Sequence, residues 1–156
     1  MNQNLAITVA QEFVMPAYDQ DHHTVIAFFK GQDMQFAIPV DSEQQTLNLL
    51  SQFLELFCMA MADQENSVGL AMISVAQEFV KPIMVEDHEN TNSLDIPYGV
   101  NIYNPAVAFY KGDKLLNCIV VKEGMDQCLG LCSRFLELFV NAIVRYRELE
   151  SYVQAC

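Results

Sequence analysis

The feature that most constrains the fold of this chain is a repeat inside it. The segment Ala10–Pro16 recurs as Ala76–Pro82, 66 positions later, with six of seven residues identical. Further along, Phe53–Phe57 returns unchanged as Phe135–Phe139. Similar segments that recur in the same order are typical of duplicated structural units. Two copies fall short of the three that an open solenoid needs, so we expect two fused units in one domain.

We place the repeats at residues 5–64 and 67–150, within a single domain that spans all 156 residues. The second copy is longer by about fifteen residues, which lie between His88 and Ala106. A unit of under eighty residues buries only a marginal core by itself, whereas a chain of this length buries about two thirds of its surface. Fusion of the two copies therefore explains how one adequate core is built.

Each repeat predicts a β-hairpin. Thr24–Lys30 and Met34–Val40 are rich in β-branched and aromatic residues, and they flank Gly31, which can take a positive φ in a tight turn. Pro39 removes a backbone donor from the second strand, which favours an edge position for it. The second copy repeats the pattern in Ala106–Tyr110 and Leu115–Val121.

A long amphipathic helix is expected after each hairpin. Ser42, with Gln45 three residues later, matches a capping box, and Asp41 is the alternative cap. Apolar residues then recur every three or four positions, which predicts one broad buried face formed by Leu47, Leu50, Leu54, Phe57 and Met61. The second helix repeats this spacing in Leu129, Cys132, Leu136, Phe139, Ile143 and Tyr146.

The second helix is predicted to continue to about Val153, which exceeds the length that a small domain needs for its own core. We expect part of it to project and to form the seam of a homodimer. The alternative is that Gly130 kinks or shortens the helix.

The segments that open the repeats, 5–16 and 67–82, fit both a helical and an alternating pattern. We favour a helix for the first and a strand through Val80–Val85 for the second. Together these patterns predict an α+β fold of internally duplicated β-hairpin-plus-helix units. In that fold the hairpins form one antiparallel sheet, and the helices pack on one of its faces.

The charge of the chain excludes several classes of function. Eight Lys and Arg against twenty Asp and Glu give a formal charge of -12. Nucleic acids and anionic membrane surfaces require a positive face, so we predict neither as a partner. Residues 1–80 hold ten acids and one base, a charge of -9, so a basic partner would be steered toward the first copy.

The hydropathy, the N-terminal residues and the cysteines of the chain favour a cytoplasmic location for the protein. No apolar run reaches the 18 to 20 residues of a membrane span, and the first residues lack the basic start of a signal peptide. Five cysteines form no Cys-x-x-Cys pair, which is typical of reduced thiols.

The histidines lie in acidic segments at equivalent places of the two repeats. His22 and His23 follow Asp21, and His88 follows Asp87. Imidazole and carboxylate groups together suit divalent transition metals. However, no Cys or further His joins them at a recognised ligand spacing. We therefore predict no metal site and no cofactor.

Two acids, Glu12 and Glu78, are also duplicated, and paired carboxylates are used in general acid-base catalysis. No nucleophile or nucleotide-binding motif accompanies them, so we expect solvated side chains. An alternative stays open, in which Glu12, Glu78, His22 and His88 converge on a pocket between the repeats that binds or transforms a small molecule. A further alternative is an acidic mimic of nucleic acid, which would need carboxylates in regularly spaced rows.

Large aromatic and aliphatic residues supply the candidates for contact with a partner. The insertion 89–105 contains Tyr98 and Tyr103, whose rings offer rigid amphipathic contact area. The same insertion could instead form an extra strand, Val100–Tyr103. On the long second helix the candidates are Phe139, Ile143 and Tyr146.

These observations favour a small, acidic, cytosolic module that binds other proteins and has no catalytic activity. We expect it to be an adaptor or a chaperone-like protein and to act as a homodimer. In size, acidity and alternation of hairpins with amphipathic helices, the chain resembles the small chaperones of bacterial secretion systems. The resemblance is one of class, and it implies a protein partner.

Overall fold

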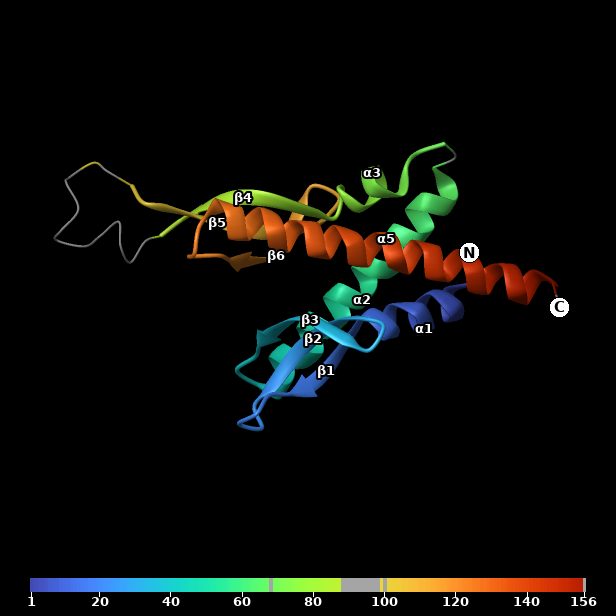
Figure 1. Cartoon of the computed structure of the whole chain (residues 1–156), viewed down its shortest axis with the longest axis horizontal. Coiled ribbons are helices and arrows are strands. Elements are labelled where there is room, and N and C mark those ends of the chain that lie inside the picture. Colours follow the sequence, from blue (N-terminus) through green and yellow to red (C-terminus); the bar gives the residue numbers. More distant parts are fainter. Residues whose placement is uncertain (68, 88–98, 100, 156) are drawn as a thin grey trace. The chain divides into compact units, whose positions relative to one another are not determined.

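The computed structural model describes residues 1–67, 69–87, 99 and 101–155, and its helices and antiparallel strands form an α+β fold, as predicted (Figure 1). The chain divides into two compact units. Unit 1 comprises Met1–Ala76 and Leu136–Cys156, and unit 2 comprises Gln77–Phe135. The single domain of two repeats stays a prediction.

Unit 1 contains one three-stranded antiparallel sheet, in the order β1-β2-β3, and the helices around it. Its complete elements are α1 (Gln3–Phe13), β1 (Val14–Tyr18), β2 (Thr24–Lys30), β3 (Asp33–Pro39), α2 (Glu43–Asn66) and α3 (Met72–Ala76). The C-terminal part of α5 (Met125–Ala155) also belongs to this unit.

Unit 2 contains a second sheet, in the order β4-β5-β6, and the first turns of α5. Its strands are β4 (Val80–Glu86), β5 (Tyr103–Lys111) and β6 (Lys114–Val120). The two hairpins therefore do not share the one sheet that we expected. In each unit the segment before the hairpin supplies a third strand, which pairs with the free side of the hairpin's first strand and makes that strand central.

The two sheets have the same pairing register. Val14 pairs with Phe28 in unit 1, and Val80 pairs with Phe109 in unit 2. A β-bulge follows Phe28 and another follows Phe109. Equivalent positions of the two repeats thus occupy equivalent positions of the two sheets.

Both hairpins turn at a glycine. Gly31 has φ +63° and Gly112 has φ +62°, values in the left-handed region that glycine adopts without a Cβ penalty. Pro39 ends β3, which lies at the edge of its sheet, so the predicted edge position is confirmed.

The N-terminus of α2 is capped as the sequence predicts. Ser42 is the N-cap, and its Oγ accepts a hydrogen bond from the Gln45 backbone N–H at 3.1 Å. The Gln45 side-chain oxygen in turn accepts from the backbone N–H of Asp41. The first of these bonds satisfies a donor that the helix end would otherwise leave without a partner, and the second satisfies the N–H of the residue before the cap.

The opening segments differ between the repeats. In the first, α1 is a helix of eleven residues, as favoured by its pattern. In the second, α3 has only five residues, and β4 then covers the stretch predicted as strand. Tyr103 begins β5 and forms part of a nine-residue strand, while Val100 lies outside the described residues.

The apolar stripe of each long helix is buried only in part. On α2 the buried apolar side chains are Phe53, Leu56, Phe57, Ala60 and Met61. Leu47 is 55% exposed, and its counterpart on α5, Leu129, is 48% exposed. The expectation that these two leucines are buried is therefore wrong. Periodicity identifies one face of a helix, but neighbouring elements decide which of its turns are covered.

By length and composition alone, helix α5 is long and apolar enough to cross a membrane. Core helices of soluble proteins can have the same length and composition. Within unit 1 it supplies core side chains, namely Leu138, Phe139, Ala142, Ile143 and Tyr146. It continues as one helix through Gly130, so the alternative of a helix shortened there is wrong.

Candidate functional site

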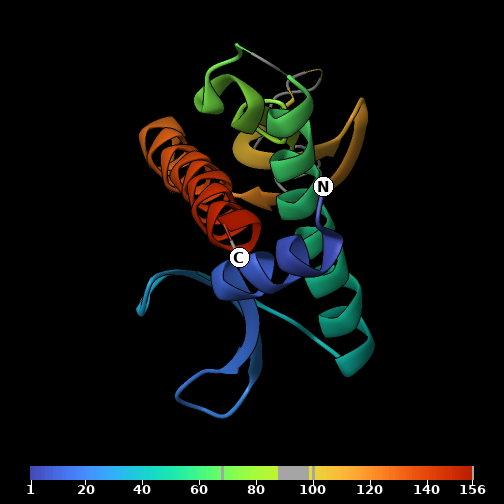
Figure 2. The ribbon, with the colours of Figure 1, turned by 90° about the vertical axis from the view of Figure 1, so that its right-hand side faces the viewer.

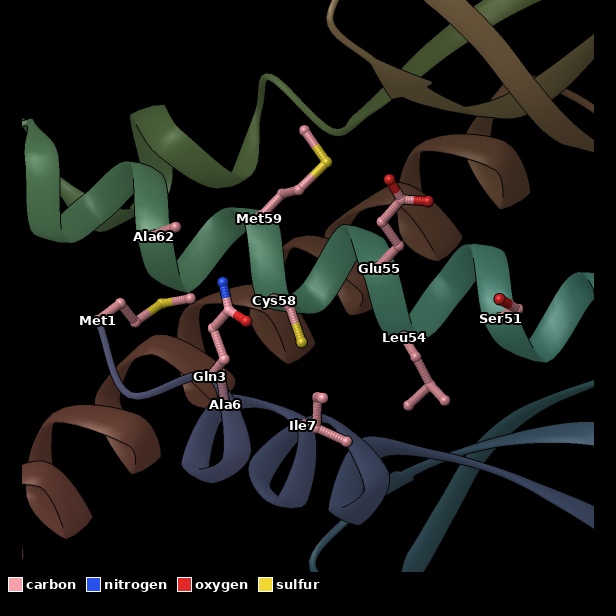
Figure 3. A pocket seen from close by; sticks show the side chains of 10 residues that line it. All are labelled: Met1, Gln3, Ala6, Ile7, Ser51, Leu54, Glu55, Cys58, Met59 and Ala62. Carbon is pink, nitrogen blue, oxygen red and sulfur yellow. The ribbon is translucent and has the colours of Figure 1, made fainter.

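An apolar groove lies between α1 and α2 in unit 1. Figure 2 shows α1 lying across α2, and Figure 3 shows the side chains that line the groove. Its volume is about 460 Å³. Seven of its ten lining residues are apolar, and the polar ones are Gln3, Ser51 and Glu55.

One wall of the groove comes from α1. Asn2 begins this helix, and its Oδ1 accepts a hydrogen bond from the Leu5 backbone N–H at 3.1 Å. Ala6 is fully buried and is one of the residues that line the groove. The neighbouring Ile7 lies on the groove side and is 45% exposed. Thus α1 buries one face in the core and offers a second apolar face to the groove.

The other wall comes from α2. Leu54, Cys58 and Ala62 are spaced by four residues, so they form one row along the helix. Leu54 and Cys58 point from α2 toward α1, as Figure 3 shows, whereas Glu55 and Met59 point from α2 away from α1. The lining runs from Ser51 to Ala62, which is about 16 Å at 1.5 Å per residue.

The surroundings of the groove are acidic. Together α1 and α2 contain no Lys or Arg, and their acids are Glu12, Glu43, Glu55, Asp63 and Glu65. Unit 1 as a whole holds twelve acids and three bases, a formal charge of -9. Burial raises the pKa of the Cys58 thiol above its usual value, and the nearby Glu55 carboxylate raises it further. The groove therefore has a mostly apolar lining, and the protein around it carries a net negative charge.

The Asp-His segment of the first repeat, for which no metal site was predicted, lies on the β1–β2 connection of unit 1. Asp19, Asp21 and His23 are all exposed, and their ligand atoms lie within 4.8 Å of one another. Asp19 Oδ1 accepts from the backbone N–H of Asp21 at 2.9 Å and of His23 at 2.8 Å. His22 takes a positive φ of 64° and is exposed. These hydrogen bonds give the cluster a structural role in holding the turn.

The four residues that were predicted to converge on a pocket do not all lie in one described unit of the structure. Glu12 belongs to unit 1, where its Oε2 lies 3.3 Å from Nε of Arg145. Glu78 is exposed in unit 2, on the turn before β4. His88 lies outside the described residues. Convergence of the four therefore stays a prediction.

The side chains predicted to contact a partner fall into three groups by position and exposure. Tyr98 lies outside the described residues, and Tyr103 is 49% exposed at the start of β5. Phe139 and Ile143 are buried in unit 1, where the Phe139 ring stacks on Phe57 at a centroid distance of 4.4 Å. These last two side chains thus hold α5 in the core of the unit.

Tyr146, the last of these candidates, is 2% exposed. Its hydroxyl accepts a hydrogen bond from the Asn2 backbone N–H at 3.0 Å and donates one to Glu150 at 2.6 Å. Burial, followed by the hydrogen bond with Glu150, raises the pKa of Tyr146 to about 12. Tyr146 therefore ties α5 to the start of α1.

The sequence interpretation missed the groove. Leu54 was assigned to the buried stripe, and Ile7, Cys58 and Met59 were not singled out. A signal exists in the sequence, because α2 is apolar at more positions than one core-facing stripe requires. Its excess apolar residues include Leu54, Cys58 and Met59, which line the groove.

Comparison with protein-family models finds no matching family. Comparisons with curated proteins and with solved structures find no match either.

Proposed function

We propose that this protein is a non-catalytic protein-binding module, an adaptor or a chaperone-like protein, and that the α1–α2 groove is its docking surface. The observation that carries the proposal is the groove itself, an apolar channel with Ile7 45% exposed in its wall. Contiguous exposed apolar surface on a soluble protein commonly marks an interaction site. A groove between two helices suits the apolar face of a peptide segment.

The form of the groove favours a polypeptide over a small molecule. Small-molecule pockets enclose most of their ligand and direct a few polar groups at it. Here Ile7 and Met1 are 45% and 48% exposed, so the groove is open to solvent on the side of α1. Its three polar residues are spread over two helices. Met1 and Met59 add flexible thioethers, which adapt to partners of different shape.

The proposal includes a duplicated origin for the chain. It is supported by the shared register and bulges of the two sheets and by the equal φ values of their turn glycines. It also includes a homodimer and a cytoplasmic location. The exposed side chains of Tyr152 and Val153, on the last turns of α5, offer apolar surface for a dimer. Free thiols at Cys58, Cys118, Cys128 and Cys132 are typical of a reducing compartment.

Affinity capture from the native cell tests the proposal with three forms of the full chain. These are the unmodified protein, Ile7→Gln in the groove, and Met34→Gln on β3, whose side chain is 58% exposed and does not line the groove. We expect one polypeptide to be recovered with the unmodified protein and with Met34→Gln, and to be lost with Ile7→Gln. Failure to recover any polypeptide, or its equal recovery with all three forms, would contradict the proposal.

A further inference from the structure

We infer that the occupant of the groove is an amphipathic helix with a basic flank, supplied by a partner protein. The inference rests on the proposed function and adds the chemistry of the partner. It depends on three properties of the groove: its length, its apolar row and the charge around it.

The length of the groove matches a short helix. Its α2 wall spans about 16 Å, which equals three turns of an α-helix at 5.4 Å per turn. A helix of that length presents apolar side chains at i, i+3 or i+4, and i+7 from one face. On the groove side, Leu54, Cys58 and Ala62 provide a row of the same period, with Ile7 facing it from α1. Ridges and grooves of this spacing are the basis of helix-on-helix packing.

The charge around the groove selects a basic helix. Five acids and no Lys or Arg lie on the two helices that form its walls. Two of these acids are paired, Glu12 with Arg145 at 3.3 Å and Glu65 with the N-terminal ammonium of Met1 at 3.8 Å, so the surroundings of the groove stay negative overall. An acidic helix would meet like charges there, which costs affinity and slows association. A helix with Lys or Arg beside its apolar face would gain electrostatic attraction, above all at low salt.

The same argument disfavours a second copy of this chain as the occupant. A second copy brings a formal charge of -12, and its α1 and α2 are again free of Lys and Arg. The exposed end of α5, around Tyr152 and Val153, carries Glu148 and Glu150 beside Arg147, so it offers no basic flank. The helix therefore comes from another protein.

Two synthetic peptides test the inference against the full-length protein. One is an 18-residue amphipathic helix of Leu and Lys, with Leu at i, i+3, i+4 and i+7. The other is its matched counterpart with Glu in place of every Lys. Each carries a fluorescent label, and binding is measured by anisotropy at low and high salt. The forms compared are the unmodified protein, Ile7→Gln and Met34→Gln, with circular dichroism to confirm that all three are folded.

We expect the Leu/Lys peptide to bind the unmodified protein and Met34→Gln within about twofold of each other, and Ile7→Gln at least tenfold more weakly. We expect the Leu/Glu peptide to bind at least tenfold more weakly than the Leu/Lys peptide at low salt. If the Leu/Glu peptide binds the groove equally well, the inference that the partner helix has a basic flank is wrong, but the proposal that the groove is a docking surface is not contradicted. If Ile7→Gln leaves Leu/Lys binding unchanged, the groove is not where a helix binds. If neither peptide binds and cell extract yields no polypeptide, both the inference and the proposed function fail.

Discussion

Phe28 of β2 meets Phe53 of α2 edge to face, with ring centroids 4.9 Å apart and ring planes at 85°. In unit 2, Phe109 of β5 meets Phe135 of α5 with the same distance and the same angle. All four rings are at most 1% exposed. In each unit an aromatic pair thus joins a strand to a helix in the core, in a geometry that the ring quadrupoles favour.

This equivalence predicts similar losses from matched substitutions. We expect Phe53→Ala and Phe135→Ala each to lower the free energy of unfolding of its own unit by about 3 to 5 kcal/mol, the usual range for a buried ring. Urea denaturation of the two variants and the unmodified protein measures this. A loss below about 1 kcal/mol for either variant would contradict the central position of that ring in its unit.

A second prediction concerns the part of the apolar stripe that the structure leaves uncovered. Leu47 is 55% exposed, whereas Phe57 is fully buried and stacks on both Phe13 and Phe139. We expect Leu47→Ala to change the free energy of unfolding by no more than about 0.5 kcal/mol, as surface substitutions do. Phe57→Ala should cost about 3 to 5 kcal/mol. Equal losses in urea denaturation would favour the fully buried stripe that periodicity predicts.

A third prediction concerns pH. The pKa of Tyr146 is about 12 in the folded protein, and an unfolded tyrosine has a pKa near 10. Because the folded pKa is the higher one, the stabilisation linked to this proton is complete below pH 10 and is lost as the pH rises from 10 to 12. The midpoint of urea unfolding should therefore fall more steeply between pH 10 and pH 12 for the unmodified protein than for Tyr146→Phe. Parallel curves would show that the phenol does not have a raised pKa.

A fourth prediction distinguishes a surface ion pair from a functional carboxylate. The side chains of Glu12 and Arg145 are 42% and 45% exposed, so solvent screens their attraction. We expect Glu12→Gln to lower the free energy of unfolding by at most about 1 kcal/mol, and 0.5 M salt to remove most of that difference. Thermal unfolding at two salt concentrations is the measurement. A much larger loss that persists in salt would point to a buried role for Glu12.

Local signals in the sequence were sufficient for much of the fold. The spacing from Ser42 to Gln45 identified the start of α2, and Gly31 and Gly112 identified the hairpin turns. Pro39 correctly marked an edge strand. Each of these features depends on a few neighbouring residues, whose hydrogen bonds and backbone angles act within one turn of chain.

Features set by contacts between distant segments could not be predicted in the same way. The hairpins were assigned to one sheet because their own patterns do not show that β1 and β4 complete a separate sheet for each. Leu47 and Leu54 were both assigned to the buried face of α2. The exposure of Leu47 depends on which turns of α2 are covered by neighbouring elements, and the place of Leu54 in the groove depends on where α1 crosses α2. Periodicity carries no information about that crossing.

The most direct test of the docking groove uses the thiol in its wall. Cys58 lines the groove and Cys118 lies on β6, so their alkylation rates, followed by mass spectrometry at pH 8.5, give a reporter and an internal reference in one chain. With saturating Leu/Lys peptide, we predict that alkylation of Cys58 slows at least tenfold while that of Cys118 changes by less than twofold. An unchanged rate at Cys58 under saturating peptide would contradict the claim that a helix docks between α1 and α2.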